Sequence, residues 1–330
     1  MIGAGVIGAS HVAALSALQA RAALLTVQTR RPERASDLAR LYDGPPPVLT
    51  DDLADVTGNP DIQAVIVATP PSVRIDLIEA LAGAGKHILL EKPIARTSEE
   101  ARRVVENCEA AGVTLGMVFQ HRFRDPSQEA ARLIASGDLG ALGHVEIAAP
   151  LWRDQTYYDE AGRGTYARDG GGVLLTNAIH SIDLMLSLTG TITEVQAMTA
   201  TTPLHRMEAE DFAVAGLRFA SGAVGSLVAS TASFPPQPEV IRLHFEKASL
   251  RLDRDALEID WRDGRSERRC TAEADFQSMK VLWHRRVIED FLTALETGGA
   301  PLVTGRQALA AHQLITAIEE SSRTGRRVEI

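Results

Sequence analysis

Cysteines, long apolar runs and a positive charge balance are all scarce in this sequence, and each absence excludes a class of protein. The 330 residues include only Cys108 and Cys270, at no metal-binding spacing, which indicates a reducing compartment and two inert thiols. No segment reaches the ~18 apolar residues of a membrane helix, and no basic region of a signal peptide opens the chain. We therefore expect a cytoplasmic protein with no membrane partner. The net charge of −9 argues against nucleic acid as a main partner.

Apolar side chains are plentiful, at 45% of the residues, which is enough for about two domains. In the first third, short runs that are apolar at every position alternate with segments of helical period, the pattern of a parallel, doubly wound α/β sheet. The predicted strands cover 22–27, 64–69, 87–91 and 113–118, and the predicted helices cover 6–18, 36–42, 72–84 and 98–111.

The pattern changes near Gln120. After a helix predicted over 126–136, apolar and polar residues alternate in runs bounded by turn signals, which predicts a mainly antiparallel sheet. These runs are 144–149, 194–200, 212–219, 222–231, 239–246, 249–254 and 256–261. Helices over 276–295 and 306–323 close the chain. We expect one domain over 1–120 and an α/β domain over 121–330, whose last helix is a candidate to pack back on the first domain.

A glycine-rich turn opens the chain and fits the dinucleotide-binding pattern G-x-G-x-x-G. The first glycine permits the tight turn, the second lets the backbone approach a pyrophosphate, and the third lets the helix pack near the strand. N–H groups at the helix start would then face the phosphates. The predicted cofactor residues in this turn are Gly3, Gly5, Val6, Ile7 and Gly8. Only Met1 and Ile2 precede it, so we expect them to be the stub of a truncated first strand.

The end of the second predicted strand bears on the choice of cofactor. An acidic residue here would accept a hydrogen bond from the ribose 2′-hydroxyl of NAD(H). The chain instead has Thr29, Arg30 and Arg31, which favour the 2′-phosphate of NADP(H), with NAD(H) as the alternative. Two solvated loop arginines are the other interpretation.

Four stretches together resemble the Gfo/Idh/MocA oxidoreductases, the glucose–fructose oxidoreductase and inositol dehydrogenase family. They are GAGVIGASH (3–11), VATPP (67–71), AGKHILLEKP (84–93) and GGGVLLTNAIHSID (170–183). The resemblance implies a Rossmann domain, a second domain with a large open sheet, and hydride transfer to or from a hydroxyl-bearing carbon of a sugar or polyol. It also implies a homodimer or homotetramer through that sheet. Thr69, Pro70, Glu91 and Lys92 would complete the cofactor site.

Lys92 is the first catalytic candidate, because in the family this lysine points to the reacting hydroxyl. Partial desolvation beside a cationic ring lowers the pKa of a lysine, which can then exchange a proton with the substrate oxygen. A surface lysine at a strand end is the plainer interpretation. The resemblance also suggests that the Lys92–Pro93 bond is cis.

His180 is the second catalytic candidate. With Thr176 and Asp183 it follows the spacing i, i+4, i+7, which places all three on one face of a regular helix. Histidine carries protons near neutral pH, and Asp183 would orient the imidazole or the helix. A satisfied core histidine is the alternative. Many family members have Asp where this chain has Thr176, and a threonine cannot carry the proton.

Weaker substrate candidates lie outside these motifs. Arg122 follows the end of the first predicted domain, and Tyr157 and Arg163 lie in the loop before the triple glycine, where an arginine could hold an anionic group. A solvated polar loop is an equally good interpretation. No metal ligand is predicted.

The sequence thus predicts an NADP(H)-preferring dehydrogenase acting on CH–OH groups, with Lys92 and His180 managing the hydroxyl proton at a site between the domains. Two rivals remain: a non-catalytic regulator that binds cofactor or sugar, and a nicotinamide-dependent glycosidase of the same family.

Overall fold

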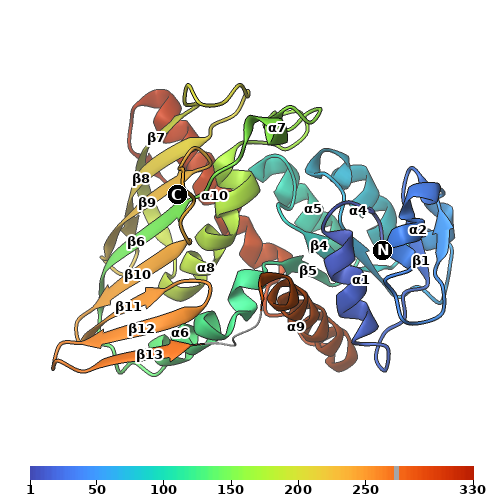
Figure 1. Cartoon of the computed structure of the whole chain (residues 1–330), viewed down its shortest axis with the longest axis horizontal. Coiled ribbons are helices and arrows are strands. Elements are labelled where there is room, and N and C mark those ends of the chain that lie inside the picture. The colour runs from blue at the N-terminus through green and yellow to red at the C-terminus, as the bar shows by residue number, and fades with distance from the viewer. Residues whose placement is uncertain (271–274) are drawn as a thin grey trace. The chain divides into compact units, whose positions relative to one another are not determined.

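The computed structural model describes residues 1–270 and 275–330, which form two compact units. The first unit comprises Met1–Ala95, Glu99–Gln120 and 275–309, and the second comprises Arg96–Ser98, 121–270 and Ala310–Ile330. Figure 1 labels most of the helices and strands of both units.

The first unit is built on a parallel sheet with the predicted strand–helix alternation. Its strands are β1 (Thr26–Gln28), β2 (Val48–Thr50), β3 (Ala64–Val67), β4 (His87–Glu91) and β5 (Leu115–Val118). Its helices are α1 (Gly8–Ser16), α2 (Ser36–Ala39), α3 (Ala54–Thr57), α4 (Arg74–Gly83), α5 (Ser98–Ala110) and α9 (Phe276–Thr297), with short turns η1 (Pro32–Ala35) and η2 (Pro71–Val73). The Rossmann-type parallel sheet is confirmed.

Ile2 takes the place of a strand between β1 and β3. It forms parallel bridges with Gln28 on one side and Val67 on the other. Its N–H donates to Ile66 O at 2.8 Å and its carbonyl accepts from Ala68 N at 2.8 Å. The sheet order β2–β1–Ile2–β3–β4–β5 is therefore continuous through a single residue, which is only 2% exposed.

The second unit contains a nine-stranded sheet in the order β13–β12–β11–β10–β6–β9–β8–β7–β14. The strands are β6 (Leu142–Pro150), β7 (Ile192–Ala200), β8 (Phe212–Phe219), β9 (Val224–Ser230), β10 (Val240–Phe245), β11 (Ala248–Leu252), β12 (Ala256–Trp261), β13 (Ser266–Cys270) and β14 (Val328–Glu329). All neighbours are antiparallel except β6 and β9, which pair in parallel. The predicted large, mainly antiparallel sheet is thus confirmed.

Helices cover one face of this sheet and leave the other open (Figure 1). They are α6 (Asp125–Ala135), α8 (Ile179–Thr189) and the later part of α10 (Gly305–Thr324), with η3 (Gln120–Phe123), α7 (Gln155–Tyr158) and η4 (Leu174–Ala178) nearby in the chain. Alternate residues of β6 are buried and partly exposed, as a sheet with one open face requires. Among the described residues, no helix combines the length and apolarity needed to cross a bilayer.

Candidate active site

The glycine-rich turn at the start of the chain has free space beside Gly5, whereas Gly3 packs closely against the backbone. Gly3 has φ +96°, and a Cβ there would lie 2.6 Å from Ala68 O, so only glycine fits. A Cβ at Gly5 would meet nothing within 4 Å, so the open space beside it is available to a dinucleotide. Val6, next in the turn, is 89% exposed. The free space beside Gly5 and the exposed Val6 side chain are what we expect of a turn over which a dinucleotide binds.

The carboxyl end of β1 presents uncompensated positive charge. Thr29 N–H donates to Thr50 O at 2.9 Å, which fixes the loop next to β2. Arg30 and Arg31 are exposed, and neither forms an ion pair within the described part of the chain. Two guanidinium groups without carboxylate partners match the charge of a 2′-phosphate.

The loops after β3 and β4 are held together by Arg74, a residue that sequence reasoning did not identify. Its side chain is buried; Nε and Nη2 donate to Thr69 O at 3.1 and 2.6 Å, and Nη1 donates to the carbonyls of Glu91 and Pro93. Burial lowers the pKa of Arg74 to about 10, against the opposing effect of Glu91. Arg74 thereby fixes the loop that carries Lys92 and the cis Lys92–Pro93 bond. A buried arginine at a helix start has no sequence signature that would have revealed it.

Thr69 offers a hydroxyl at this edge of the sheet. Its Oγ1 is buried and has no hydrogen-bond partner among the described residues. A buried hydroxyl without a partner is costly unless a ligand or water satisfies it. This atom fits the predicted role of Thr69 in holding the cofactor.

Glu91 faces the core of the first unit and anchors the residue that follows it. Its Oε1 accepts from His11 Nε2 at 2.8 Å and lies 3.8 Å from His284 Nε2, and its Oε2 accepts from Lys92 N at 3.2 Å. Burial alone would raise the pKa of this carboxyl, but the hydrogen bonds and charges of both histidines hold it well below its usual range. Glu91 thus acts on Lys92 through the backbone. His11 and His284, which complete this arrangement, were also missed from sequence.

In the second unit, Glu210 holds the helix that carries the predicted catalytic histidine. Its carboxylate accepts from Gly172 N and Leu174 N, each at 3.0 Å, and so satisfies N–H groups at the helix start. A Cβ on Gly172 would lie 1.7 Å from Glu210 O, so this position of the triple glycine tolerates only glycine. The sequence offered no signal for Glu210, which lies 38 residues from Gly172.

The helix departs from the regular α-helix expected from sequence. Residues Leu174–Ala178 form a π-helical turn, and the α-helix begins only at Ile179. Thr176 lies in the π turn, where its Oγ1 donates to Gly172 O at 2.6 Å and lies 2.9 Å from Asn177 Oδ1. The prediction that Thr176, His180 and Asp183 share one face of a regular α-helix is therefore justified only for His180 and Asp183, since the α-helix begins at Ile179. Single π turns inside helices are frequent at functional sites.

His180 stacks on His121, which precedes Arg122 in η3. The ring centroids are 4.5 Å apart with an interplanar angle of 24°, and both histidines are largely buried. His121 Nδ1 lies 3.8 Å from Glu239 Oε2. The imidazole predicted to carry a proton therefore has a second imidazole and then a carboxylate behind it.

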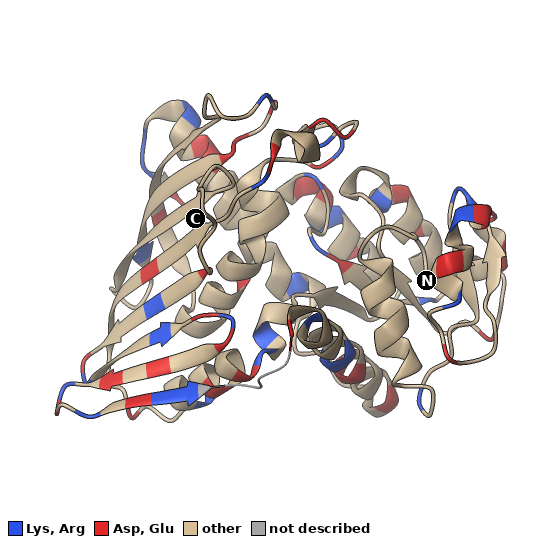
Figure 2. Cartoon of the chain, viewed as in Figure 1, with Lys and Arg blue, Asp and Glu red and all other residues tan. Residues whose placement is uncertain are grey.

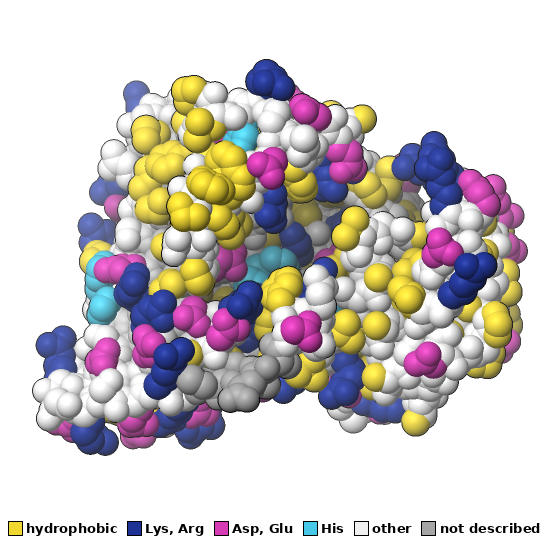
Figure 3. All heavy atoms as spheres, in the orientation of Figure 1, with side chains coloured by type: hydrophobic (Ala, Val, Ile, Leu, Met, Phe, Trp, Pro, Cys, Tyr) yellow, Lys and Arg dark blue, Asp and Glu magenta, His cyan; other side chains and the backbone are white. Residues whose placement is uncertain are grey.

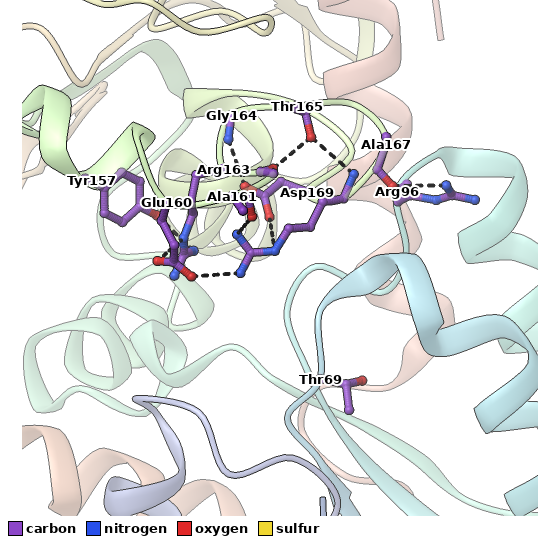
Figure 4. Close-up of polar contacts among 12 residues, drawn as sticks. Thr69, Arg96, Tyr157, Glu160, Ala161, Arg163, Gly164, Thr165, Ala167 and Asp169 are labelled. Carbon is purple, nitrogen blue, oxygen red and sulfur yellow. Dashed lines mark hydrogen bonds and ion pairs between the residues drawn. The ribbon is translucent and has the colours of Figure 1, made fainter. Parts of the chain in front are cut away.

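The remaining substrate candidates already bind other side chains. Arg122 forms a bidentate ion pair with Asp183, whose pKa is raised by burial and lowered in part by the guanidinium. Arg163 donates to Tyr157 Oη at 3.2 Å and to Glu160 Oε2 at 3.1 Å, and its guanidinium lies 4.8 Å from the Tyr157 ring centre. Figure 4 shows this loop network, in which Asp169 also accepts from Gly164 N. The loop is thus ordered by its own contacts.

The two predicted catalytic residues belong to different units: Lys92 lies in the first, and His180 lies in the second together with Thr176, which is predicted to bind the substrate. Residues 1–119 match the oxidoreductase family described as having an NAD-binding Rossmann fold, and residues 127–251 match the GFO/IDH/MocA C-terminal domain. The chain belongs to the Gfo/Idh/MocA oxidoreductase family.

Similar proteins cover nearly the whole chain. Inositol 2-dehydrogenase of Rhizobium meliloti is 28% identical over 337 residues, covering 100% of this chain and 98% of that protein. D-xylose 1-dehydrogenase (NADP⁺) 2 of Haloferax volcanii is 29% identical, covering 82% of this chain and 81% of the relative. The crystal structure of the WlbA dehydrogenase from Bordetella pertussis, in complex with NADH and UDP-GlcNAcA, superposes with a TM-score of 0.85. It is 30% identical, covering 100% of this chain and 96% of that one.

Membership of the family makes this Gfo/Idh/MocA protein a nicotinamide-dependent oxidoreductase, which confirms the enzyme class predicted from sequence. The enzyme interpretation is favoured over the regulator and the glycosidase, since the relatives that match over most of the chain are named as dehydrogenases.

Proposed function

We propose that the protein is an NADP(H)-preferring dehydrogenase or reductase that acts on a hydroxyl-bearing carbon of a sugar, polyol or related alcohol. The observation that carries this proposal is the Lys92 loop. Arg74 binds the carbonyls on both sides of Lys92, and the Glu91 carboxylate binds its N–H, so the loop is fixed at the carboxyl edge of the parallel sheet. Ligands of open α/β sheets bind at that edge.

A bound nicotinamide supplies or accepts the hydride. In the direction of oxidation the substrate C–H bond gives up a hydride, the O–H bond gives up a proton, and a carbonyl forms. We assign the proton to Lys92 and His180: the lysine nitrogen takes it from, or in reduction returns it to, the substrate oxygen, and His180 relays it toward solvent. Thr176 hydrogen-bonds the substrate and carries no proton.

We propose that Arg30 and Arg31 bind the 2′-phosphate of NADP(H). The support is their exposure at the end of β1, the absence of carboxylate partners in the described chain, and the missing ribose-binding acid at Thr29. The xylose dehydrogenase relative is named for NADP⁺, whereas the WlbA structure contains NADH, so both cofactors occur among relatives.

We further propose a cytoplasmic homo-oligomer that associates through the open face of the second unit's sheet. Met198, Val214, Val228 and Ala148 form a cross-strand row there, in which Met198 and Val228 are 55% and 41% exposed. An exposed apolar row of this kind is typical of an interface. Val228→Glu should reduce the mass measured by light scattering after size-exclusion chromatography, whereas an unchanged mass would place the interface elsewhere.

The test of the function is to follow the absorbance of reduced nicotinamide across a panel of sugars and polyols, with NADP⁺ and NAD⁺ in parallel. Turnover with at least one polyol, faster with NADP⁺, is the expected result. Cofactor binding without turnover on any compound would support the regulator. Sugar release without net nicotinamide reduction would support the glycosidase.

A further inference from the structure

Two imidazoles and a carboxylate meet on the open face of the second unit's sheet, the face opposite to helix α8, which carries His180. His144 and Glu146 are two positions apart in β6, so both point to the same side. His244 of β10 is the direct cross-strand neighbour of His144. All three side chains are partly exposed in the single chain, on the same face that we propose for association. Histidines lie beside acidic and basic side chains on the surface of this sheet in Figure 3.

The potential ligand atoms converge on one oxygen. His144 Nδ1 and His244 Nε2 each lie 3.9 Å from Glu146 Oε1, and the ligand atoms of the three residues all lie within 4.8 Å of one another. A tetrahedral ion with ligands at about 2.1 Å holds its ligand atoms roughly 3.4 Å apart. Small rotations of exposed side chains close that difference. The two imidazole rings are nearly parallel, at 13° with centroids 5.3 Å apart, so neither blocks the other.

Neighbouring residues leave the converging atoms available. His244 Nδ1 hydrogen-bonds with Ser249 Oγ at 2.9 Å, which holds the ring with Nε2 toward Glu146. Arg242 approaches the other carboxylate oxygen, Oε2, at 3.5 Å, and Oε1 faces the histidines. An outer hydrogen bond that fixes the ring and leaves the second nitrogen free is the arrangement found around metal-binding histidines.

Elsewhere on this face of the sheet, carboxylates of the described residues lie beside arginines and not beside imidazoles. The next cross-strand row runs Glu146, Arg242, Arg251, Glu258 and Arg268, a charge ladder in which the carboxylates face arginines. Figure 2 shows acidic and basic residues on the outer strands of this sheet. Glu258, for example, lies 3.3 Å from Arg251 and 3.9 Å from Arg268. Only at Glu146 does the face combine a carboxylate with two imidazoles among the described residues.

We propose that His144, Glu146 and His244 form a binding site for a divalent transition metal ion, Zn²⁺ above all. Imidazole nitrogen with one carboxylate is a common donor set for Zn²⁺, and Co²⁺ and Ni²⁺ accept the same ligands. Three protein ligands leave at least one position for water or a further ligand. The site is independent of the nicotinamide reaction.

A second set, His11, Glu91 and His284, has the same residue types but does not suit an ion. His11 Nε2 and Glu91 Oε1 are 2.8 Å apart and already share a hydrogen bond. Both imidazoles are fully buried, with side chains 0% exposed, so an ion would have to displace that bond inside the core. In a zinc titration we therefore expect the set on the open face to bind the ion and the buried set of His11, Glu91 and His284 not to bind it.

The test is calorimetric titration of the untagged, EDTA-treated protein with Zn²⁺, and with Co²⁺ to read the coordination from its visible absorption bands. We expect one equivalent per chain, with at least tenfold weaker binding in His144→Gln and in His244→Gln. Arg242→Gln should bind at least as tightly as wild type, because the guanidinium competes for the carboxylate. Glu258→Gln is the matched control and should leave the affinity unchanged.

All four substitutions lie on the open face of the sheet. A thermal melt within error of wild type confirms that each variant folds, and light scattering confirms that each keeps the mass of wild type. Absence of saturable Zn²⁺ binding in wild type would overturn the proposal. So would affinity that survives both histidine changes, or that is lost in Glu258→Gln. None of these outcomes bears on nicotinamide turnover, which is measured separately.

Discussion

Asp183 of α8 and Arg122 of η3 form a bidentate ion pair, with Oδ2 2.7 Å from Nε and Oδ1 2.6 Å from Nη2. The Asp183 side chain is 1% exposed and that of Arg122 is 12% exposed. The pair joins the segment carrying His121 to the helix carrying His180, and those two rings stack. Arg122 and Asp183 therefore position the histidine region, and both oxygens of the Asp183 carboxylate are engaged in the ion pair.

Asp183→Asn should lower the free energy of unfolding by about 3 kcal/mol, because removing one partner leaves a largely buried charge without compensation. Urea unfolding followed by circular dichroism measures this. The matched control is Asp37→Asn, which breaks the exposed pair with Arg40 and should change nothing measurable. A loss of stability in Asp37→Asn as large as in Asp183→Asn would contradict the distinction.

The same substitution at two neighbouring positions of the triple glycine should destabilise the protein at Gly172 and have little effect at Gly171. Gly172→Ala places a Cβ 1.7 Å from the Glu210 carbonyl oxygen, so the backbone must move and the N–H bonds to the Glu210 carboxylate weaken. We expect a loss of several kcal/mol or failure to fold. A Cβ at Gly171 would come no closer than 3.3 Å to any atom, so Gly171→Ala should fold with a Tm within a few degrees of wild type. Equal melting temperatures for both variants would show that the close approach of Gly172 to the Glu210 carbonyl oxygen does not require glycine.

Glu319 should make stability depend on pH near neutrality. Burial, and next the charge of Glu210, raise the pKa of Glu319 to about 7 from its usual 4.5. The folded state therefore binds the proton of the Glu319 carboxyl more tightly than the unfolded state does. The resulting contribution to the free energy of unfolding is fully present below about pH 4.5 and is lost as the pH rises through about 7. Allowing for partial exposure, we expect about 2 kcal/mol across this range.

Glu319→Gln should flatten this part of the pH–stability curve measured by chemical unfolding, and the exposed Glu320→Gln serves as control. Should stability rise between pH 5 and 7 in wild type relative to Glu319→Gln, the assigned pKa direction would be wrong.

The sequence predicted elements with clear periodicity and missed those built by contacts between distant segments. Apolar runs predicted β3, β4 and β5, and alternating runs predicted the strands from β6 to β12. The three-residue β2 carries too little pattern to be recognised and exists because it pairs with β1. The π turn at Thr176 was missed because its residues have ordinary helical composition.

The same division applies to the candidate site. The motifs identified Lys92 and His180 because their neighbours in sequence are distinctive. Arg74 and Glu210 act on backbone groups that are brought near only by folding, and no local pattern marks them. The His144–Glu146–His244 cluster depends on the register of β6 against β10, which periodicity alone does not fix.

Cofactor preference should follow the charge at the end of β1. Thr29→Asp should shift the ratio of kcat/KM toward NAD⁺, because a carboxylate can accept from a ribose hydroxyl and repels a 2′-phosphate. Arg30→Ala and Arg31→Ala should each weaken NADP⁺ binding about tenfold and leave NAD⁺ nearly unchanged. Parallel saturation curves with both cofactors give the ratio. An unchanged ratio in all three variants would reject the assignment of the arginines.

The central claim is that Lys92 exchanges the proton of the reacting hydroxyl, and Lys92→Met tests it most directly. Single-turnover formation of reduced nicotinamide should be measured on a substrate found in the panel, with cofactor affinity measured separately by fluorescence. We predict a rate at least a hundredfold lower than wild type, with cofactor affinity within threefold. Hydride transfer at the wild-type rate in folded Lys92→Met, with the same pH profile, would contradict the account.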